Sequence, residues 1–244
     1  MENPFILCCM HRVELNYRGL PYRTVYLEFP DIESVCKQIG APPTSKKGDG
    51  SDHYTLPVIY DSATNRTISD SYNISEYLEE TYPTTPRLFP VGATSPRGLS
   101  VKASLLLFDY FFMQNVFMPV LPIAIAQCNK VLNPRSQDYF RYHREIWLGD
   151  RLEDLAPKGS KKRAERWKQV RAGLDNLAHF MDQAGGEYFL GNEFSRAEII
   201  LIAFLSSIKV HVPVTEWEKN IAKANGGRWD RLLEKTRALQ AVKD

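Results

Sequence analysis

The spacing of apolar residues along the chain predicts two regions of different character. Before residue 84, helical and strand-like patterns alternate, which is typical of an α/β domain. From residue 99 to the end the apolar residues recur at helical spacing, which indicates an all-helical bundle. We therefore predict domains over 1–83 and 99–244, joined by a linker at 84–98 that is rich in Pro, Gly and Thr. In the first domain the pattern predicts helices at 10–18, 30–38 and 72–82 and strands at 22–27, 56–60 and 66–69.

Local signals refine the helical region. Two prolines within 116–131 predict a kink or break, because proline removes a helical hydrogen bond. Ser136 is placed to cap a helix that runs to about Leu155. Ser195 and Glu198, which precede the apolar run IILIAFL, have the spacing of a capping box, in which both side chains satisfy free N–H groups at a helix start.

The stretch 54–82 combines a strand edge with a helix start. Pro57 lies inside a predicted strand, where it removes a hydrogen-bond donor from the ladder. A cis bond between Leu56 and Pro57 would turn the Leu56 backbone outward, so that another chain or a ligand can pair with it. Ser71 stands at a helix N-terminus, where free N–H groups and the helix dipole favour an anion. The arrangement suits a peptide with an α-carboxylate; the alternative is a structural hairpin followed by a capped helix.

Composition and charge narrow the classes of function. The chain has 244 residues with 31 basic and 29 acidic side chains, a net charge of +2. This balance gives no bulk field for nucleic acid, so we expect no nucleic-acid partner. The cysteines are sparse and the five histidines lack metal-ligand spacing, so we expect reduced thiols in a cytoplasmic protein and no metal site. The cysteines are Cys8, Cys9, Cys36 and Cys128.

The most apolar segment lies at 103–128. Asp109, Gln114 and Asn115 interrupt it, so no continuous apolar run approaches the ~20 residues of a membrane-spanning helix. The short apolar run at 5–10 has no basic region ahead of it, unlike a signal peptide. We expect a buried helix pair at 103–128 and no membrane association.

Several segments of the chain resemble glutathione transferases. Leu56-Pro57-Val58-Ile59 and Ser69-Asp70-Ser71 resemble the glutathione-binding half of their thioredoxin-like domain, and 188–205 resembles the core helix of their C-terminal domain. The likeness runs from about Met10 to Leu239. A narrower resemblance links the chain to fungal transferases related to bacterial β-etherases. It rests on residues 15–22, 30–33, 40–45, 53–57 and 226–229.

The resemblance implies a glutathione pocket in the first domain. It implies that the Leu56 backbone, ahead of a cis Pro57, pairs with the cysteinyl part of glutathione. It also implies that Asp70 and Ser71 hold the γ-glutamyl end, with the helix N-terminus binding the carboxylate. Glutathione is then a cosubstrate, and no other cofactor is implied. The candidates for the glycyl carboxylate are Lys46, Lys47 and His53.

The resemblance further implies an apolar pocket between the domains for a second substrate, which would be a small aromatic or apolar electrophile. Aromatic residues early in the second domain are candidates for its lining, with a place in the core as the alternative for each. Homodimers are common in the family, so we expect a homodimer. The lining candidates are Tyr110, Phe112, Phe117 and Met118.

The N-terminus departs from the family pattern. A thioredoxin-like domain begins with a central strand and a loop, but only nine residues precede Met10, so the first strand is short or missing. Either 5–9 forms an improvised strand, or the true start lies upstream of the given one, and we favour the second. Related fungal proteins place a serine near the start of the first helix, where this chain has Phe5. Cys8 and Cys9 are the nearest substitutes, with two small buried hydrophobes as the alternative.

Three functions remain open at this point. The first is a glutathione transferase that conjugates glutathione to an electrophile or cleaves an aromatic ether or thioether with the thiol. The second is a carrier that binds aromatic compounds after losing catalysis. The third is an interaction module, since transferase-like domains also occur in translation factors and regulators. The sequence has no long charged tail, and we favour the enzyme.

Overall fold

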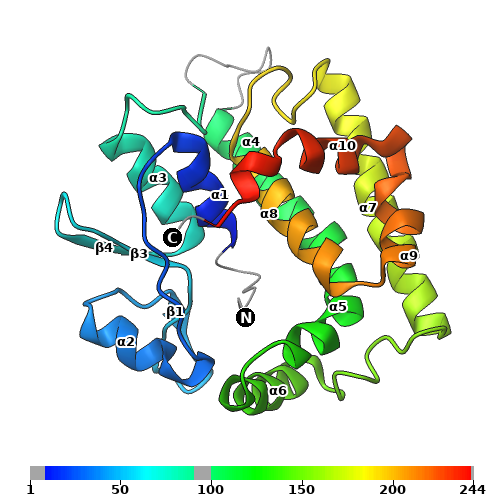
Figure 1. Ribbon diagram of the computed structural model, residues 1–244, viewed down its shortest axis with the longest axis horizontal. Coiled ribbons are helices and arrows are strands. Elements are labelled where there is room, and N and C mark those ends of the chain that lie inside the picture. Colours follow the sequence, from blue (N-terminus) through cyan, green and yellow to red (C-terminus); the bar gives the residue numbers. More distant parts are fainter. Residues whose placement is uncertain (1–8, 91–99, 243–244) are drawn as a thin grey trace.

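The computed structural model describes residues 9–90 and 100–242. An α/β region with short strands lies on the left of Figure 1, and the helices of the remaining chain lie to its right and below it. This order of elements confirms the predicted fold class, a thioredoxin-like domain with few strands followed by a helical bundle. The predicted domain limits remain a proposal, and residues 91–98 of the predicted linker lie outside the described residues.

The first domain contains the predicted hairpin and helix. Strand β3 (Val58–Asp61) pairs antiparallel with β4 (Arg66–Ser69), and α3 (Ser71–Thr81) follows at once. The apolar face predicted for α3 is buried, because its residues pack between the hairpin and α1 (Cys9–Arg18). The other elements here are η1 (Phe29–Asp31), α2 (Ile32–Gln38), β1 (Ser45–Lys46) and β2 (Asp52–His53).

The prediction of a strand at 22–27 is wrong. The segment forms no strand, and Val25 is 70% exposed. Alternating side chains make a strand only where a neighbouring backbone completes the ladder. Within 9–90 and 100–242 the sheets contain only the pairs β1–β2 and β3–β4. None of these described strands pairs with 22–27, so the segment has no ladder to join.

The second domain is built around α8 (Arg196–His211), whose apolar residues are buried on nearly every side. The predicted capping box starts this helix: the Ser195 hydroxyl accepts from the Ala197 N–H at 3.2 Å, and Glu198 accepts from the Ser195 N–H at 2.9 Å. The preceding helices are α4 (Val101–Phe112), η2 (Met113–Phe117), α5 (Met118–Lys130), α6 (Pro134–Leu148) and α7 (Lys161–Ala184). The following elements are α9 (Val214–Trp217), η3 (Glu218–Ala222), η4 (Ala224–Gly227), α10 (Arg228–Lys235) and η5 (Arg237–Gln240).

Residues 101–130 form one continuous helical segment, since the π-helical turn η2 joins α4 to α5. The segment is long and apolar enough to span a membrane, but 56% of its most apolar window is buried inside the fold. It therefore packs as the predicted core helices do. The irregular turn lies ahead of the prolines, where α7 passes closest: a Cβ on Gly173 would lie 2.2 Å from the Asn115 carbonyl oxygen.

The prediction for the helix after residue 133 needs two corrections. Asn133, not Ser136, occupies the N-cap of α6, and the Ser136 hydroxyl accepts from the Phe29 N–H at 2.9 Å and donates to Glu28. Ser136 thus ties α6 to the first domain. The helix ends at Leu148, well before residue 155, because Gly149 adopts a φ of 74° that terminates helices.

Candidate functional site

The N-terminus of α3 presents an open hydrogen-bonding position. Asp70 caps the helix, and its carboxylate accepts from the N–H groups of Tyr72 at 2.9 Å and Asn73 at 3.2 Å. The N–H and hydroxyl of Ser71 make no hydrogen bond to any described residue. Since the helix dipole points its positive end here, Ser71 offers two donors to an anion.

The backbone next to this position, at Leu56, is not hydrogen-bonded into the β3–β4 ladder. The Leu56–Pro57 peptide bond is cis, as the sequence predicted. The ladder between β3 and β4 begins at Val58, opposite Ser69, so Leu56 lies beyond it. The Leu56 backbone and the start of α3 are therefore neighbours, since Ser69 directly precedes the Asp70 cap.

A buried polar network links α3 to α1. The Ser75 hydroxyl donates to Glu14 at 2.7 Å, and Arg18 donates to Glu79 at 2.7 Å. Both pairs join residues 61 apart in the chain, so α1 and α3 run parallel and in step. One helical turn earlier, His11 lies level with the first turn of α3.

Opposing effects set the protonation of this network. Burial raises the pKa of Glu14, but the hydrogen bond and charge of His11, the Ser75 hydroxyl and Arg18 outweigh it, so the pKa lies below its ordinary value. Burial likewise raises the pKa of Glu79, and hydrogen bonds from Arg87, Arg18 and the Leu88 N–H outweigh it. Both groups are therefore carboxylates in the folded chain at neutral pH.

Helix α8 completes the network through Arg196. Its guanidinium donates to Ser75 at 3.3 Å and to Asp109 of α4, and it lies 5.1 Å from the centre of the Tyr72 ring. Burial raises the pKa of Asp109 and the charge of Asp70 adds to this, while Arg196 opposes both.

Several buried polar atoms around this start have no hydrogen-bond partner among the described residues. Buried polar groups are nearly always paired in folded proteins, so unpaired atoms of this kind need an explanation. The atoms are His11 Nε2, Ser69 Oγ, Tyr72 Oη and Asp109 Oδ1.

The candidates for the glycyl carboxylate lie on the exposed β1–β2 loop. Lys46 pairs with Asp52 at 2.6 Å, and Lys47 pairs with Glu33 at 2.7 Å. His53 contacts the Ser45 hydroxyl at 3.1 Å. Exposed ion pairs of this kind contribute little stability, so a ligand carboxylate can compete for either lysine.

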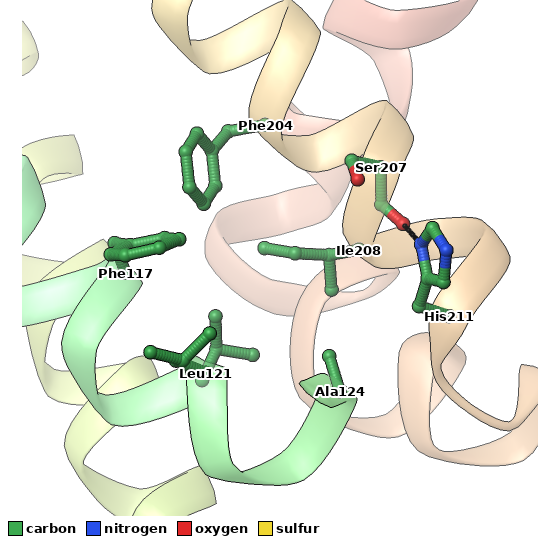
Figure 2. A pocket seen from close by; sticks show the side chains of 8 residues that line it. Phe117, Leu121, Ala124, Phe204, Ser207, Ile208 and His211 are labelled. Atoms are coloured by element: carbon green, nitrogen blue, oxygen red, sulfur yellow. Dashed lines mark hydrogen bonds between the residues drawn. The ribbon is translucent and has the colours of Figure 1, made fainter. Parts of the chain in front are cut away.

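A small apolar hollow of about 10 Å³ lies between α5 and α8, and Figure 2 shows its lining. Two of its lining rings, Phe117 and Phe204, contact each other edge to face, with centroids 4.6 Å apart. We call it the α5–α8 hollow. Its lining residues are Phe117, Val120, Leu121, Ala124, Phe204, Ser207, Ile208 and His211.

The structure brings only part of the predicted second-substrate set to this hollow. Phe117 lines it, and Met118 packs beside it against the neighbouring apolar cluster. Phe112 is 0% exposed in the main core, whereas Tyr110 is 69% exposed on the outer side of α4. Sequence reasoning missed Phe204 on α8, because the continuous apolar run of that helix does not show which side faces a cavity.

Known proteins of one family resemble this chain. The family model described as "Glutathione S-transferase, C-terminal domain" matches residues 103–239. The chain belongs to the glutathione transferase family. A solved transferase of Ceriporiopsis subvermispora, CsGST63524 in complex with glutathione, is 38% identical with a TM-score of 0.89, over 98% of this chain and 92% of that one.

Other relatives agree with this membership. The transferase GSTFuA3 from Phanerochaete chrysosporium is 36% identical with a TM-score of 0.88, covering 99% of this chain and 92% of its own. The glutathione S-transferase-like protein ustS of Aspergillus flavus is 28% identical over 219 residues, which cover 80% of this chain and 70% of that protein. The resemblance to glutathione transferases read from the sequence is thereby confirmed.

Two cysteines of the chain, Cys36 and Cys128, are free and buried. Burial raises the pKa of Cys36, and burial raises that of Cys128 to about 12. Neither provides a thiolate at neutral pH. Cys8 and the side chain of Cys9 lie outside the described residues, as does Phe5 at the position of the family serine. Within the described residues no cluster of His, Cys, Asp or Glu is arranged to hold a metal ion.

Proposed function

We propose that this protein binds glutathione at the start of α3 and directs its thiol at a small aromatic or apolar electrophile. The observation that carries the proposal is the open Ser71 position, surrounded by buried polar atoms without partners. An amino-acid end carries a carboxylate and an ammonium. The helix N-terminus suits the carboxylate, and the free oxygen of Asp109 suits the ammonium.

The rest of the glutathione molecule makes further contacts in this proposal. The Leu56 backbone pairs with the cysteinyl part, while Lys47 and His53 lie on the loop nearest the glycyl end. CsGST63524, which is 38% identical, was solved in complex with glutathione, and this supports the same ligand here. Glutathione is a cosubstrate in this scheme, with no further cofactor.

Two reactions fit the proposed sites. In conjugation, the glutathione sulfur attacks an electrophilic carbon, a C–S bond forms and the leaving group departs with its electron pair. In thiolytic cleavage, the same attack breaks the C–O or C–S bond of an aromatic ether or thioether, as the resemblance to etherase-like transferases suggests. A group that stabilises the thiolate belongs at the N-terminal end of α1, where Cys8 and Cys9 are the candidates.

We also propose a cytoplasmic homodimer. Helix α4 and the start of η2 expose several large apolar side chains, and exposed apolar surface on a folded domain favours association. Because homodimers are common in the family, we expect a second copy of the chain to cover these side chains. The exposed side chains are Leu106, Leu107, Tyr110 and Met113.

Turnover of a halonitrobenzene with glutathione tests the enzymatic proposal. We expect a measurable rate of conjugate formation, and a lower rate for a Cys8→Ser, Cys9→Ser double variant if a cysteine stabilises the thiolate. Calorimetric binding of glutathione without any turnover would favour the carrier function. If glutathione does not bind at all, both ligand-based functions fail and the interaction module gains support.

A further inference from the structure

One arginine of the second domain reaches the helix that starts at the proposed glutathione site. Arg196 is the first residue of α8, directly after the Ser195 cap, and its side chain is 3% exposed. Its Nε–H donates to the Ser75 hydroxyl on α3 at 3.3 Å. Ser75 lies about one helical turn after Ser71. Arg196 therefore contacts α3 one turn away from the proposed γ-glutamyl position.

The same guanidinium holds the carboxylate of Asp109 on α4. Its Nη1–H donates to Asp109 Oδ2, while Asp109 Oδ1 has no hydrogen-bond partner among the described residues. The Tyr72 ring covers the guanidinium, with 5.1 Å from the guanidinium carbon to the ring centre. A planar guanidinium that bonds to two groups and stacks on a ring has little freedom to turn. Asp109 is therefore held with Oδ2 on Arg196 and with Oδ1 free.

The charge of Arg196 also affects the protonation of Asp109. Burial raises the pKa of Asp109, the charge and hydrogen bond of Arg196 lower it, and the charge of Asp70 raises it. Among the described residues, no other cation forms an ion pair with Asp109. Loss of Arg196 would therefore raise this pKa further and favour the neutral acid. A ligand ammonium binds more strongly to a carboxylate than to a neutral acid.

The contacts of Arg196 join the two domains, unlike those of a comparable pair. Arg163 on α7 pairs with Glu216 on α9 at 3.0 Å, with side chains 11% and 19% exposed. That pair lies within the second domain, on the side away from α3 (Figure 1). Arg196 instead links α8 and α4 to α3. It thus fixes Asp109 of the second domain relative to the start of α3 in the first.

We propose that Arg196 is a positioning residue for the γ-glutamyl amine of glutathione. It holds Asp109 so that the free Oδ1 accepts from the ligand ammonium, while the start of α3 binds the carboxylate of the same amino-acid end. Arg196 acts through Asp109 and does not itself contact the ligand. This inference rests on the proposed function, since it concerns recognition of glutathione at the same site.

Two ligands that differ only in the amine test the proposal by equilibrium binding. Glutathione carries the ammonium, whereas glutaryl-Cys-Gly lacks it and keeps the carboxylate and the rest of the tripeptide. We expect calorimetry on the full chain to show at least about tenfold tighter binding of glutathione, the scale of one hydrogen bond between charged groups. Asp109→Asn and Arg196→Gln should each reduce this preference to less than about threefold. General damage to the site would instead weaken both ligands alike.

Two further variants complete the experiment. Arg163→Gln breaks the comparable pair with Glu216 and should leave the preference intact. Arg196→Lys keeps the positive charge, so it protects the test if Arg196→Gln does not fold. The lysine ammonium lacks the planar fork that reaches both Ser75 and Asp109, so we expect a preference between those of the wild type and Asp109→Asn.

The outcomes separate this inference from the proposed function. The inference is overturned if the wild type binds both ligands equally, if Asp109→Asn or Arg196→Gln keeps the preference, or if Arg196→Gln weakens both ligands alike. A full preference in Arg196→Lys also overturns it. A wild type that binds neither ligand overturns the proposed function as well, whereas equal binding of both leaves glutathione binding at the start of α3 intact.

Discussion

Arg18 on α1 donates to Glu79 on α3 across 2.7 Å, with their side chains 0% and 9% exposed. Arg18 also bonds to Glu14 at 3.1 Å, so one guanidinium serves two buried carboxylates. This contact holds α1 and α3 in step, and their N-terminal ends meet at the proposed glutathione site. The geometry of the proposed site therefore depends on an ion pair that lies two helical turns away from it.

Replacing Arg18 should unfold the chain far more easily. Arg18→Met removes a cationic partner from each of two buried carboxylates and leaves Glu79 with Arg87 alone. Breaking a buried ion pair typically costs about 3–5 kcal/mol. Urea denaturation measures the free energy of unfolding. The control is Arg237→Met, which breaks an exposed pair with Glu234 and should cost less than about 0.5 kcal/mol. Similar losses for both variants would contradict a buried network.

The same network predicts an acid dependence of stability. The pKa of Glu14 in the folded chain lies below its ordinary 4.5. Such a carboxylate stabilises the fold above its unfolded pKa, and this contribution is lost as the pH falls through the folded pKa. We expect the free energy of unfolding to decline below about pH 4.5. In Glu14→Gln the decline should be shallower, and an unchanged slope would contradict this assignment.

The close approach of α7 to η2 predicts a steric effect. A Cβ on Gly173 would lie 2.2 Å from the Asn115 carbonyl oxygen, a backbone atom that cannot move alone. Gly173→Ala should therefore cost about 1–3 kcal/mol in thermal or urea unfolding. Gly48→Ala is the matched control, since a Cβ there meets nothing within 4 Å. Equal stability of the two variants would disprove the tight contact.

The start of α8 predicts a capping effect. Ser195→Ala removes the hydroxyl that accepts from Ala197 and donates to Glu198 at 2.8 Å. We expect a loss of about 1 kcal/mol, the usual value for an N-cap. Ser62→Ala, in the exposed turn between β3 and β4, should be neutral in the same urea titration. A neutral Ser195→Ala would show that the cap contributes nothing.

Local chemistry explains which parts of the fold were predictable. The capping box at Ser195 and the helix opening at Asp70 depend on residues close in sequence, and the structure has both. The strand expected at 22–27 depends on a distant partner, so alternation alone predicted it wrongly. Phe112 and Phe117 have the same chemistry and lie on one helical segment. Only the packing of α8 decides that Phe112 is core and that Phe117 lines the hollow.

The buried polar atoms without hydrogen-bond partners could not be predicted from the sequence either. Ser71 was identifiable, because a helix N-terminus can be read from its neighbours. His11, Tyr72 and Asp109 come from three helices, and their lack of hydrogen-bond partners shows only in the folded chain.

Calorimetric titration of glutathione into the wild type and Ser71→Ala tests the central claim most directly. We predict that the wild type binds and that Ser71→Ala binds at least about tenfold more weakly, because a hydrogen bond to a carboxylate is lost. Ser34→Ala, an exposed serine of α2, should bind like the wild type. A wild type that fails to bind glutathione, or a Ser71→Ala variant with unchanged affinity, would contradict a glutathione site at the start of α3.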